Sequence, residues 1–166
     1  MDANKIRLEN MMNLYGTDIL RYCTLQLKDA KQAEDAAQEV FIKAWRALDR
    51  FQGRSNEKTW LLRIAINTCR DYQRTGWFRR MDRSITPEDL PECGAEDRSY
   101  DRLPVTEAVR QLPPGLRNVI WLRYYEGMKL PEIAQTVGLS EATVKRRLSD
   151  AAAILRQKLE GWYEDE

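Results

Sequence analysis

Three arginines and one asparagine recur at helical spacing between residues 59 and 75. Arg63, Asn67, Arg70 and Arg74 follow each other at i, i+4, i+7 and i+11. A helix would hold them in one line along roughly 16 Å. A guanidinium fork fits a phosphate, and an asparagine amide can pair with the edge of a base. The opposite face is apolar and consists of Leu62, Ala65, Ile66, Cys69 and Tyr72. This pattern predicts an amphipathic helix that binds nucleic acid, although a merely solvated helix face would use the same residue types.

The segment just before this helix has the composition of a loop that could accept an unstacked base. Residues 51–60 are polar and contain a flexible glycine, Gly53. Their hydrogen-bonding side chains are Arg54, Ser55, Asn56 and Lys58. Donors and acceptors of this kind can pair with a base edge, and the flanking aromatic residues Phe51 and Trp60 could stack on a base. For Trp60 we favour a place in the core over contact with a base.

A second nucleic-acid surface is predicted near the end of the chain, at residues 130–148. Ile133, Ala134 and Val137 form one apolar face, and Gly138 then allows a left-handed turn without a Cβ clash. Ser140 is expected to cap a new helix with Glu141 in its first turn. The apolar positions of this helix are Val144, Leu148, Ala151 and Leu155, and its other side carries Lys145, Arg146 and Ser149. The segment is typical of a helix-turn-helix (HTH), whose second helix lies in the DNA major groove.

The helix expected at about 31–51 differs in character, because its first half is acidic. Glu34, Asp35, Gln38 and Glu39 gather there, while Val40, Ala44, Trp45 and Leu48 form its apolar stripe. Acids near a helix N-terminus are stabilised by the helix dipole, which is one sufficient explanation. The other explanation is a docking surface for a basic protein, since carboxylates repel DNA. Charge alone does not decide between the two.

Composition argues against catalysis and against bound cofactors or metals. The chain has 166 residues and no histidine, so histidine triads and most hydrolytic metal sites are excluded. Its three cysteines are widely spaced, which argues against a disulfide framework and a zinc site. We expect no catalytic residue, no metal ligand and no cofactor. No stretch approaches the roughly 18 apolar residues of a membrane span, and the first residues lack a signal-peptide core, so we expect a cytoplasmic protein without membrane insertion.

Helical periodicity fills most of the chain, and the fold class predicted is all-α. Residues from about 5 to 75 form almost continuous helix with one break near 52–53, and helical spacing returns from about 105 to 162. Residues 76–104 hold three prolines and many acids, which is typical of a flexible linker. Net charge is +7 over residues 42–83 and −4 over 84–104. We therefore predict two small helical domains, at 1–75 and 105–166, joined by the linker, with the HTH in the C-terminal domain.

Taken together, these motifs closely resemble the extracytoplasmic-function (ECF) sigma factors of bacterial RNA polymerase. The resemblance rests on DAAQEVFIKAW at 35–45, FQGRS at 51–55, TWLLRIAINTCRDYQR at 59–74, LPPGLRNV at 112–119 and the HTH. It spans nearly the whole chain in the family's order. It implies a non-enzymatic specificity subunit that binds core RNA polymerase and promoter DNA, with an anti-sigma factor as a further partner.

The resemblance also implies roles for residues. The acidic helix would dock on the polymerase β′ clamp through Asp35, Gln38, Glu39 and Phe41, with Phe41 serving either packing or contact. The −10 promoter element would be read by Arg54, Ser55, Asn56, Lys58, Arg63, Asn67, Arg70 and Arg74. The −35 element would be read by Ser140, Glu141, Thr143, Lys145, Arg146, Arg147 and Ser149, and the same domain would meet the β flap.

One departure from the family pattern concerns the recognition helix. Asp150 and Ala152 stand where basic residues are common in the family. Lys145, Arg146 and Arg147 would then supply most of the −35 electrostatics, unless Arg156 and Lys158 assist or Arg147 pairs with Asp150. A weak −35 interaction is therefore expected. Two other readings stay open: a stand-alone HTH regulator with a dimerising helical domain, and a polymerase-binding antagonist that reads −35 DNA poorly.

Overall fold

The computed structural model describes residues 2–51, 53, 56–74 and 104–164, with side chains omitted at 104–106 and 161–164. Every regular element in this part of the chain is a helix. The chain divides into two compact units, within Met1–Gly94 and within Ala95–Glu166. The predicted all-α fold with two helical parts is confirmed. The predicted domain limits stay a prediction, and nearly all of the predicted linker lies outside the described residues.

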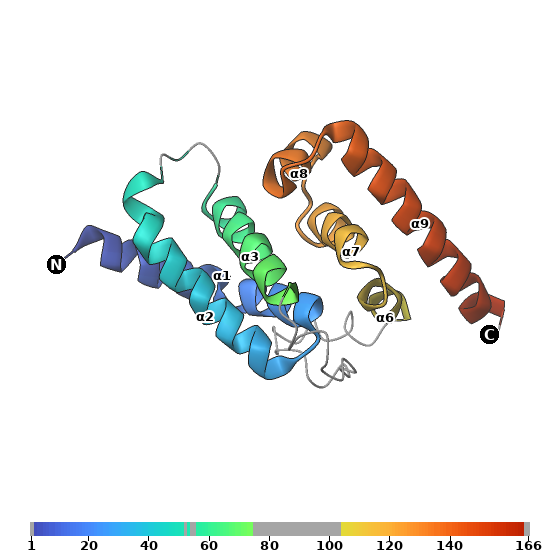
Figure 1. Cartoon of the computed structure of the whole chain (residues 1–166), viewed down its shortest axis with the longest axis horizontal. Helices are drawn as coiled ribbons and strands as arrows, with labels where there is room; N and C mark the ends of the chain where they lie inside the picture. The colour runs from blue at the N-terminus through green and yellow to red at the C-terminus, as the bar shows by residue number, and fades with distance from the viewer. Residues whose placement is uncertain (1, 52, 54–55, 75–103, 165–166) are drawn as a thin grey trace. The chain divides into compact units, whose positions relative to one another are not determined.

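The first unit is a three-helix arrangement. It consists of α1 (Ala3–Leu27), α2 (Ala30–Ala47), the short 3₁₀ helix η1 (Leu48–Arg50) and α3 (Glu57–Gln73). Each of the three long helices packs against the other two (Figure 1). Their shared core holds, among others, Met11, Ile19, Tyr22, Leu27, Val40, Ala44, Leu48, Leu61, Leu62 and Ile66. Apolar burial of this extent is the main force that fixes α3 against α1 and α2.

The sequence predicts one break in the helices of this unit, but the structure has a second one, because α1 ends at Leu27 and α2 begins at Ala30. Lys28 adopts a left-handed conformation with φ 55°, and its backbone N–H donates to the Thr24 carbonyl. Asp29 then caps α2, accepting a hydrogen bond of 2.9 Å from the Gln32 backbone N–H. A left-handed lysine is uncommon, so the sequence gives little warning of this turn. Asp29 is the residue from which this break could have been predicted, since aspartate is a preferred N-cap.

The second unit contains the HTH. Its elements are α6 (Pro104–Arg110), α7 (Pro114–Ile120), the π-helical segment η3 (Trp121–Tyr125), α8 (Leu130–Val137) and α9 (Glu141–Glu164). Figure 1 shows the long α9 running beside α6 and α7, with α8 leading into it. One core cluster joins these helices: Val109, Leu112, Ile120 and Ala151, with Leu116, Leu148, Ile154 and Leu155 packed against it. The apolar stripe of α9 therefore faces inward, and its polar side stays available.

Two buried arginines stabilise the inner end of this unit. Arg117 donates from Nη1 to the Arg110 carbonyl at 2.8 Å, and Arg110 donates to Glu107 at the same distance. Both arginine side chains are almost completely buried. They tie α6 to α7 from inside, so neither is part of a DNA-binding face.

Candidate nucleic-acid interface

Helix α3 has the two faces that its sequence predicts. Arg63, Asn67, Arg70 and Arg74 are all exposed, while Leu62, Ala65, Ile66 and Cys69 are buried. Arg74 lies 3.9 Å from Asp71, and both side chains are about two-thirds exposed, so this ion pair is weak. An incoming phosphate can replace Asp71 at little cost. The basic row is thus presented to solvent on a helix whose other side is fixed in the core.

The loop before α3 turns out to be partly committed to structure. Asn56 is the N-cap of α3, and its Oδ1 accepts from the Thr59 backbone N–H at 2.7 Å. Lys58 forms an ion pair of 3.1 Å with Asp18 of α1. Arg54 and Ser55 lie outside the described residues. The side-chain oxygen of Asn56 therefore does not face a base, although its Nδ2 hydrogens remain suited to one.

The two aromatic residues that flank this loop pack on each other. The rings of Phe51 and Trp60 lie 4.7 Å apart between centroids. The Arg7 guanidinium lies over Phe51 at 4.9 Å, and Arg7 Nε donates to Glu57 at 3.1 Å. Trp60 is partly buried, which supports packing over base contact. This cluster fixes both ends of the loop against α1.

The predicted docking residues on α2 fall into two groups. Asp35 and Gln38 are exposed, whereas Phe41 is only 8% exposed. Glu39 is partly buried and engaged, because Lys43 lies 3.6 Å from its carboxylate and Tyr72 of α3 is hydrogen-bonded to it. Burial, followed by the charge of Glu39 and this hydrogen bond, raises the pKa of Tyr72 above 10.0. Glu39 thus joins α2 to α3, while Asp35 and Gln38 face solvent.

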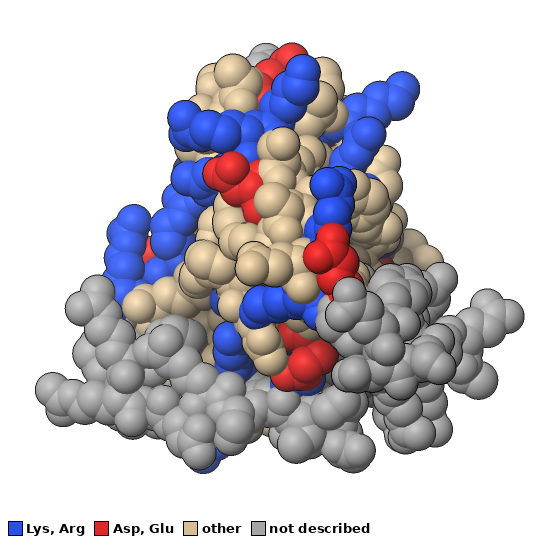
Figure 2. Space-filling view, turned by 90° about the vertical axis from the view of Figure 1, so that its right-hand side faces the viewer, with Lys and Arg blue, Asp and Glu red and all other residues tan. Residues whose placement is uncertain are grey.

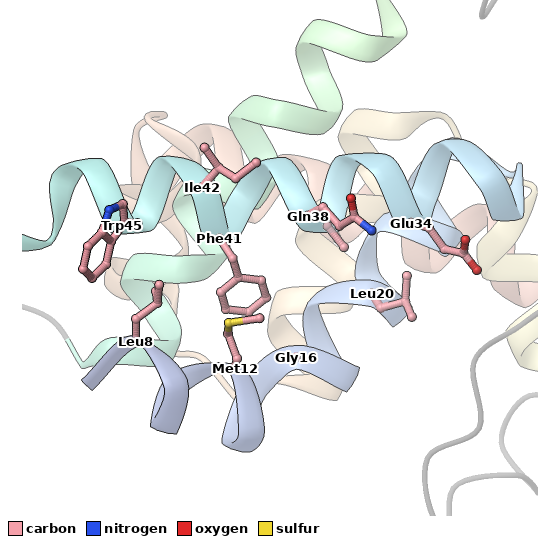
Figure 3. Close-up of a pocket in the computed structure, with 10 residues that line it drawn as sticks. Leu8, Met12, Gly16, Leu20, Glu34, Gln38, Phe41, Ile42 and Trp45 are labelled. Carbon is pink, nitrogen blue, oxygen red and sulfur yellow. The ribbon is translucent and has the colours of Figure 1, made fainter. Parts of the chain in front are cut away.

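An apolar groove lies between α1 and α2, and the sequence analysis missed it. Its volume is about 580 Å³, and its walls are Leu8, Met12, Gly16, Leu20, Glu34, Ala37, Gln38, Phe41, Ile42 and Trp45. Figure 3 shows Phe41 pointing toward Met12, with Leu8 across from Trp45. Trp45 was predicted to lie in the inward stripe of α2, but it is 43% exposed, and Ile42 beside the groove is 50% exposed. Phe41, Ile42 and Trp45 form a second apolar face on α2, offset from the inward one. This second face is the sequence feature from which the groove could have been predicted.

The predicted HTH is confirmed in its turn and its cap. Gly138 ends α8 with φ 72° and ψ 35°, the left-handed conformation that glycine adopts without strain. The Oγ of Ser140 accepts from the Thr143 backbone N–H at 3.2 Å and donates to the Thr143 hydroxyl at 2.9 Å. Val144 and Ala151 are fully buried on the inner side of α9. The turn therefore sets α9 with one side against the core and the other toward solvent.

The residues predicted to read the −35 element differ in their exposure. Ser140, Glu141, Lys145, Arg146 and Ser149 are exposed, while Thr143 and Arg147 are partly buried. Figure 2 shows the face of the molecule on the right-hand side of Figure 1, where Lys and Arg side chains stand out with fewer acids between them. Lys158, which was considered as a further −35 cation, donates to Gln111 at 2.8 Å. Asp150, Ala152 and Arg156 are exposed, and the ion pair suggested between Arg147 and Asp150 is not formed among the described side chains.

Comparison with known proteins identifies both units. Residues 11–79 match the family Sigma-70 region 2, and residues 102–155 match Sigma-70, region 4. The RNA polymerase sigma-H factor of Pseudomonas aeruginosa is 34% identical over 159 residues, which cover 88% of this chain and 82% of that protein. The ECF RNA polymerase sigma factor SigL of Mycobacterium tuberculosis is 34% identical over 144 residues, covering 84% and 81%. The chain belongs to the ECF family of RNA polymerase sigma factors.

Solved structures agree with this membership. CnrH, solved in complex with the cytosolic domain of CnrY, matches with a TM-score of 0.68 and 25% identity over 96% of this chain and 91% of that one. The sigma factor RpoE of Bartonella quintana, solved with the anti-sigma factor NepR, matches with a TM-score of 0.67 and 25% identity over 92% and 96%. Sigma factors are specificity subunits that bind DNA rather than enzymes. The alternative of a stand-alone HTH regulator is therefore set aside.

Family membership also assigns the surfaces of this ECF factor to sigma-factor regions. The basic row of α3 and the α1–α2 groove residues from Met12 onward fall within the region 2 match, and the HTH falls within the region 4 match. None of the described helices has the length and apolar character needed to cross a membrane. The described residues also contain no cluster of His, Cys, Asp and Glu that could hold a metal ion.

Proposed function

We propose that this sigma factor reads the −10 element of its promoters with the outer row of α3. The exposure of Arg63, Asn67, Arg70 and Arg74 on a helix with a buried back is the observation that carries this proposal. Guanidinium groups bind backbone phosphates, and the asparagine amide can pair with a base edge. Arg54, Ser55, Asn56 and Lys58 would hold an unpaired base beside this row. Lys58 would have to exchange its ion pair with the partly buried Asp18 for a phosphate.

The polymerase would dock on the solvent-facing side of α2. Asp35 and Gln38 are exposed there and offer polar contacts to a basic partner such as the β′ clamp. The apolar groove beside them offers Phe41 and Trp45 to an apolar side chain of the same partner. Phe41 would then serve both packing and contact. Glu39 would act indirectly, since its hydrogen bond with Tyr72 and its ion pair with Lys43 link the docking helix to α3.

The −35 element would be read by α9. Lys145 and Arg146 are exposed cations near its start, directly after the Ser140 cap, and Glu141, Thr143 and Ser149 lie along the same helix. With Asp150 and Ala152 exposed nearby, few phosphate contacts remain, which supports a weak −35 interaction. The same unit would meet the β flap of the polymerase, as the family resemblance implies.

A protein partner would hold the factor inactive in the cytoplasm. RpoE of Bartonella quintana is bound by an anti-sigma factor, and a similar partner is proposed for this chain. The exposed apolar side chains of the groove, Met12, Ile42 and Trp45, give such a partner a surface to cover. Covering it would also remove the proposed polymerase contact.

Charge reversal on α3 tests the proposal. Holoenzyme would be assembled from core polymerase and either Arg70→Glu or Arg74→Glu, with Lys5→Glu, an exposed reversal on α1, as the matched control. We expect polymerase affinity to be unchanged and open-complex formation to fall about tenfold or more with either α3 variant. Unchanged initiation with Arg70→Glu and Arg74→Glu would show that α3 does not hold promoter DNA.

A further inference from the structure

Arg147 differs from the two cations that precede it on α9. Lys145 and Arg146 are exposed, whereas Arg147 is partly buried. Val144 three residues earlier and Ala151 four residues later are fully buried. Residues at these spacings share one face of a helix. The backbone position of Arg147 therefore lies at the edge of the core-facing side of α9.

The end of the Arg147 side chain lies on a glycine of another helix. A Cβ added at Gly115 would stand 2.8 Å from Nη1 and 3.4 Å from Cζ of Arg147. Gly115 is in the first turn of α7, directly after Pro114. The guanidinium thus occupies the space that any other residue at position 115 would fill with its side chain.

This seat has the right chemistry for a positioning contact. A long arginine stem can cover apolar surface and so contribute packing as well as charge. Leu116 and Leu148, the residues that follow Gly115 and Arg147, both pack on the core cluster that joins α7 to α9. The contact between Arg147 and Gly115 therefore continues the α7–α9 packing toward the DNA-facing end of α9.

We propose that Arg147 is a positioning residue, which seats the recognition helix on α7 at Gly115 and makes no phosphate contact; this inference rests on the proposed placement of α9 in the major groove. Gly115 is the other half of the seat. Lys145 and Arg146 are then the cations of α9 that neutralise phosphates, and Arg147 sets the angle at which they approach.

Salt dependence separates a phosphate contact from a positioning contact. Holoenzyme binding would be measured on a labelled promoter duplex recovered by run-off transcription, and on the same duplex with its −35 element scrambled, between about 50 and 200 mM salt. Lys145→Ala and Arg146→Ala should each reduce the log–log salt slope by about one unit. Arg147→Ala should leave the slope unchanged and reduce the preference for the intact −35 element about fivefold. A slope reduced by about one unit with Arg147→Ala would overturn the proposal.

Gly115→Ala provides an independent test that keeps Arg147 in place. The added Cβ meets the flexible end of an arginine, so we expect the guanidinium to leave its seat while α7 stays folded. Gly115→Ala should therefore lower the −35 preference as Arg147→Ala does, and the double variant should be no worse than either single one. Additive losses would contradict the shared seat.

The failure of the proposed function would look different. If Lys145→Ala and Arg146→Ala leave the salt slope unchanged, then α9 does not lie on DNA. The seat is then judged by thermal denaturation of the four proteins of the Gly115 and Arg147 cycle. Non-additive shifts of the melting temperature support the contact, and additive shifts reject it.

Discussion

Replacing Trp45 by alanine should separate polymerase binding from folding. Trp45 lines the α1–α2 groove and is 43% exposed, so removing it leaves the buried core of α2 in place (Figure 3). A tryptophan side chain offers up to about 250 Å² of surface, of which about 100 Å² is then available to a partner. At about 25 cal/mol per Å², and after allowing for the alanine, its burial is worth up to about 2 kcal/mol. That corresponds to at most about a 30-fold rise in Kd.

The assay is a titration of labelled sigma factor with core polymerase, read by fluorescence anisotropy, together with thermal denaturation. Area converts only in part to affinity, so we expect a loss between about threefold and 30-fold. Leu14→Ala is the matched control, because Leu14 is 66% exposed on α1, one of the two helices that form the groove, but does not line the groove. Equal polymerase affinity of Trp45→Ala and the wild type would refute the groove as a docking site. An equal loss with Leu14→Ala would refute its specificity.

Three further predictions concern residues that hold the proposed surfaces in place. Asn56→Ala should lower stability by about 1 kcal/mol, whereas Asn56→Asp should keep the α3 cap; urea unfolding measures both, and equal stability of the two variants would contradict the capping role. Tyr72→Phe should cost about 1 kcal/mol at pH 7. Because the pKa of Tyr72 is raised in the folded state, the wild type keeps this advantage below pH 10.0 and loses it as pH rises through the folded pKa, so a deficit that stays constant in alkaline unfolding experiments would argue against the Glu39 contact. Gly138→Ala should destabilise the HTH by about 1–2 kcal/mol, whereas Gly16→Ala within α1 should be neutral or stabilising. Calorimetry measures both, and equal changes in stability would contradict the need for a left-handed residue at position 138.

Helical periodicity and turn-forming residues allow much of the site to be predicted from the sequence. The exposed row of α3 follows from residues spaced three and four apart, because charged side chains are seldom fully buried unless they are paired. The HTH follows from Gly138 and Ser140, whose residue types match a left-handed turn and an N-cap. Both signals are local. Their outcome depends little on which other helix packs behind them.

Features that depend on a second element could not be read in this way. The break at Lys28 is local, but it is a left-handed turn at a lysine, and only the following Asp29 indicates it. The seat of Arg147 depends on Gly115, 32 positions earlier in the chain. Lys58 looks free in the sequence until α1 brings Asp18 to 3.1 Å from it. For Arg147 and Lys58, a partner distant in sequence decides what the polar side chain does.

Run-off transcription tests the central claim most directly. Core polymerase alone and polymerase with this sigma factor would be compared on a library of genomic DNA fragments, with transcripts mapped by their 5′ ends. The account predicts new transcripts from a small set of promoters that share −10 and −35 elements, and their loss with Arg70→Glu. Transcripts that do not depend on the added protein, or that start without a shared −10 element, would contradict it.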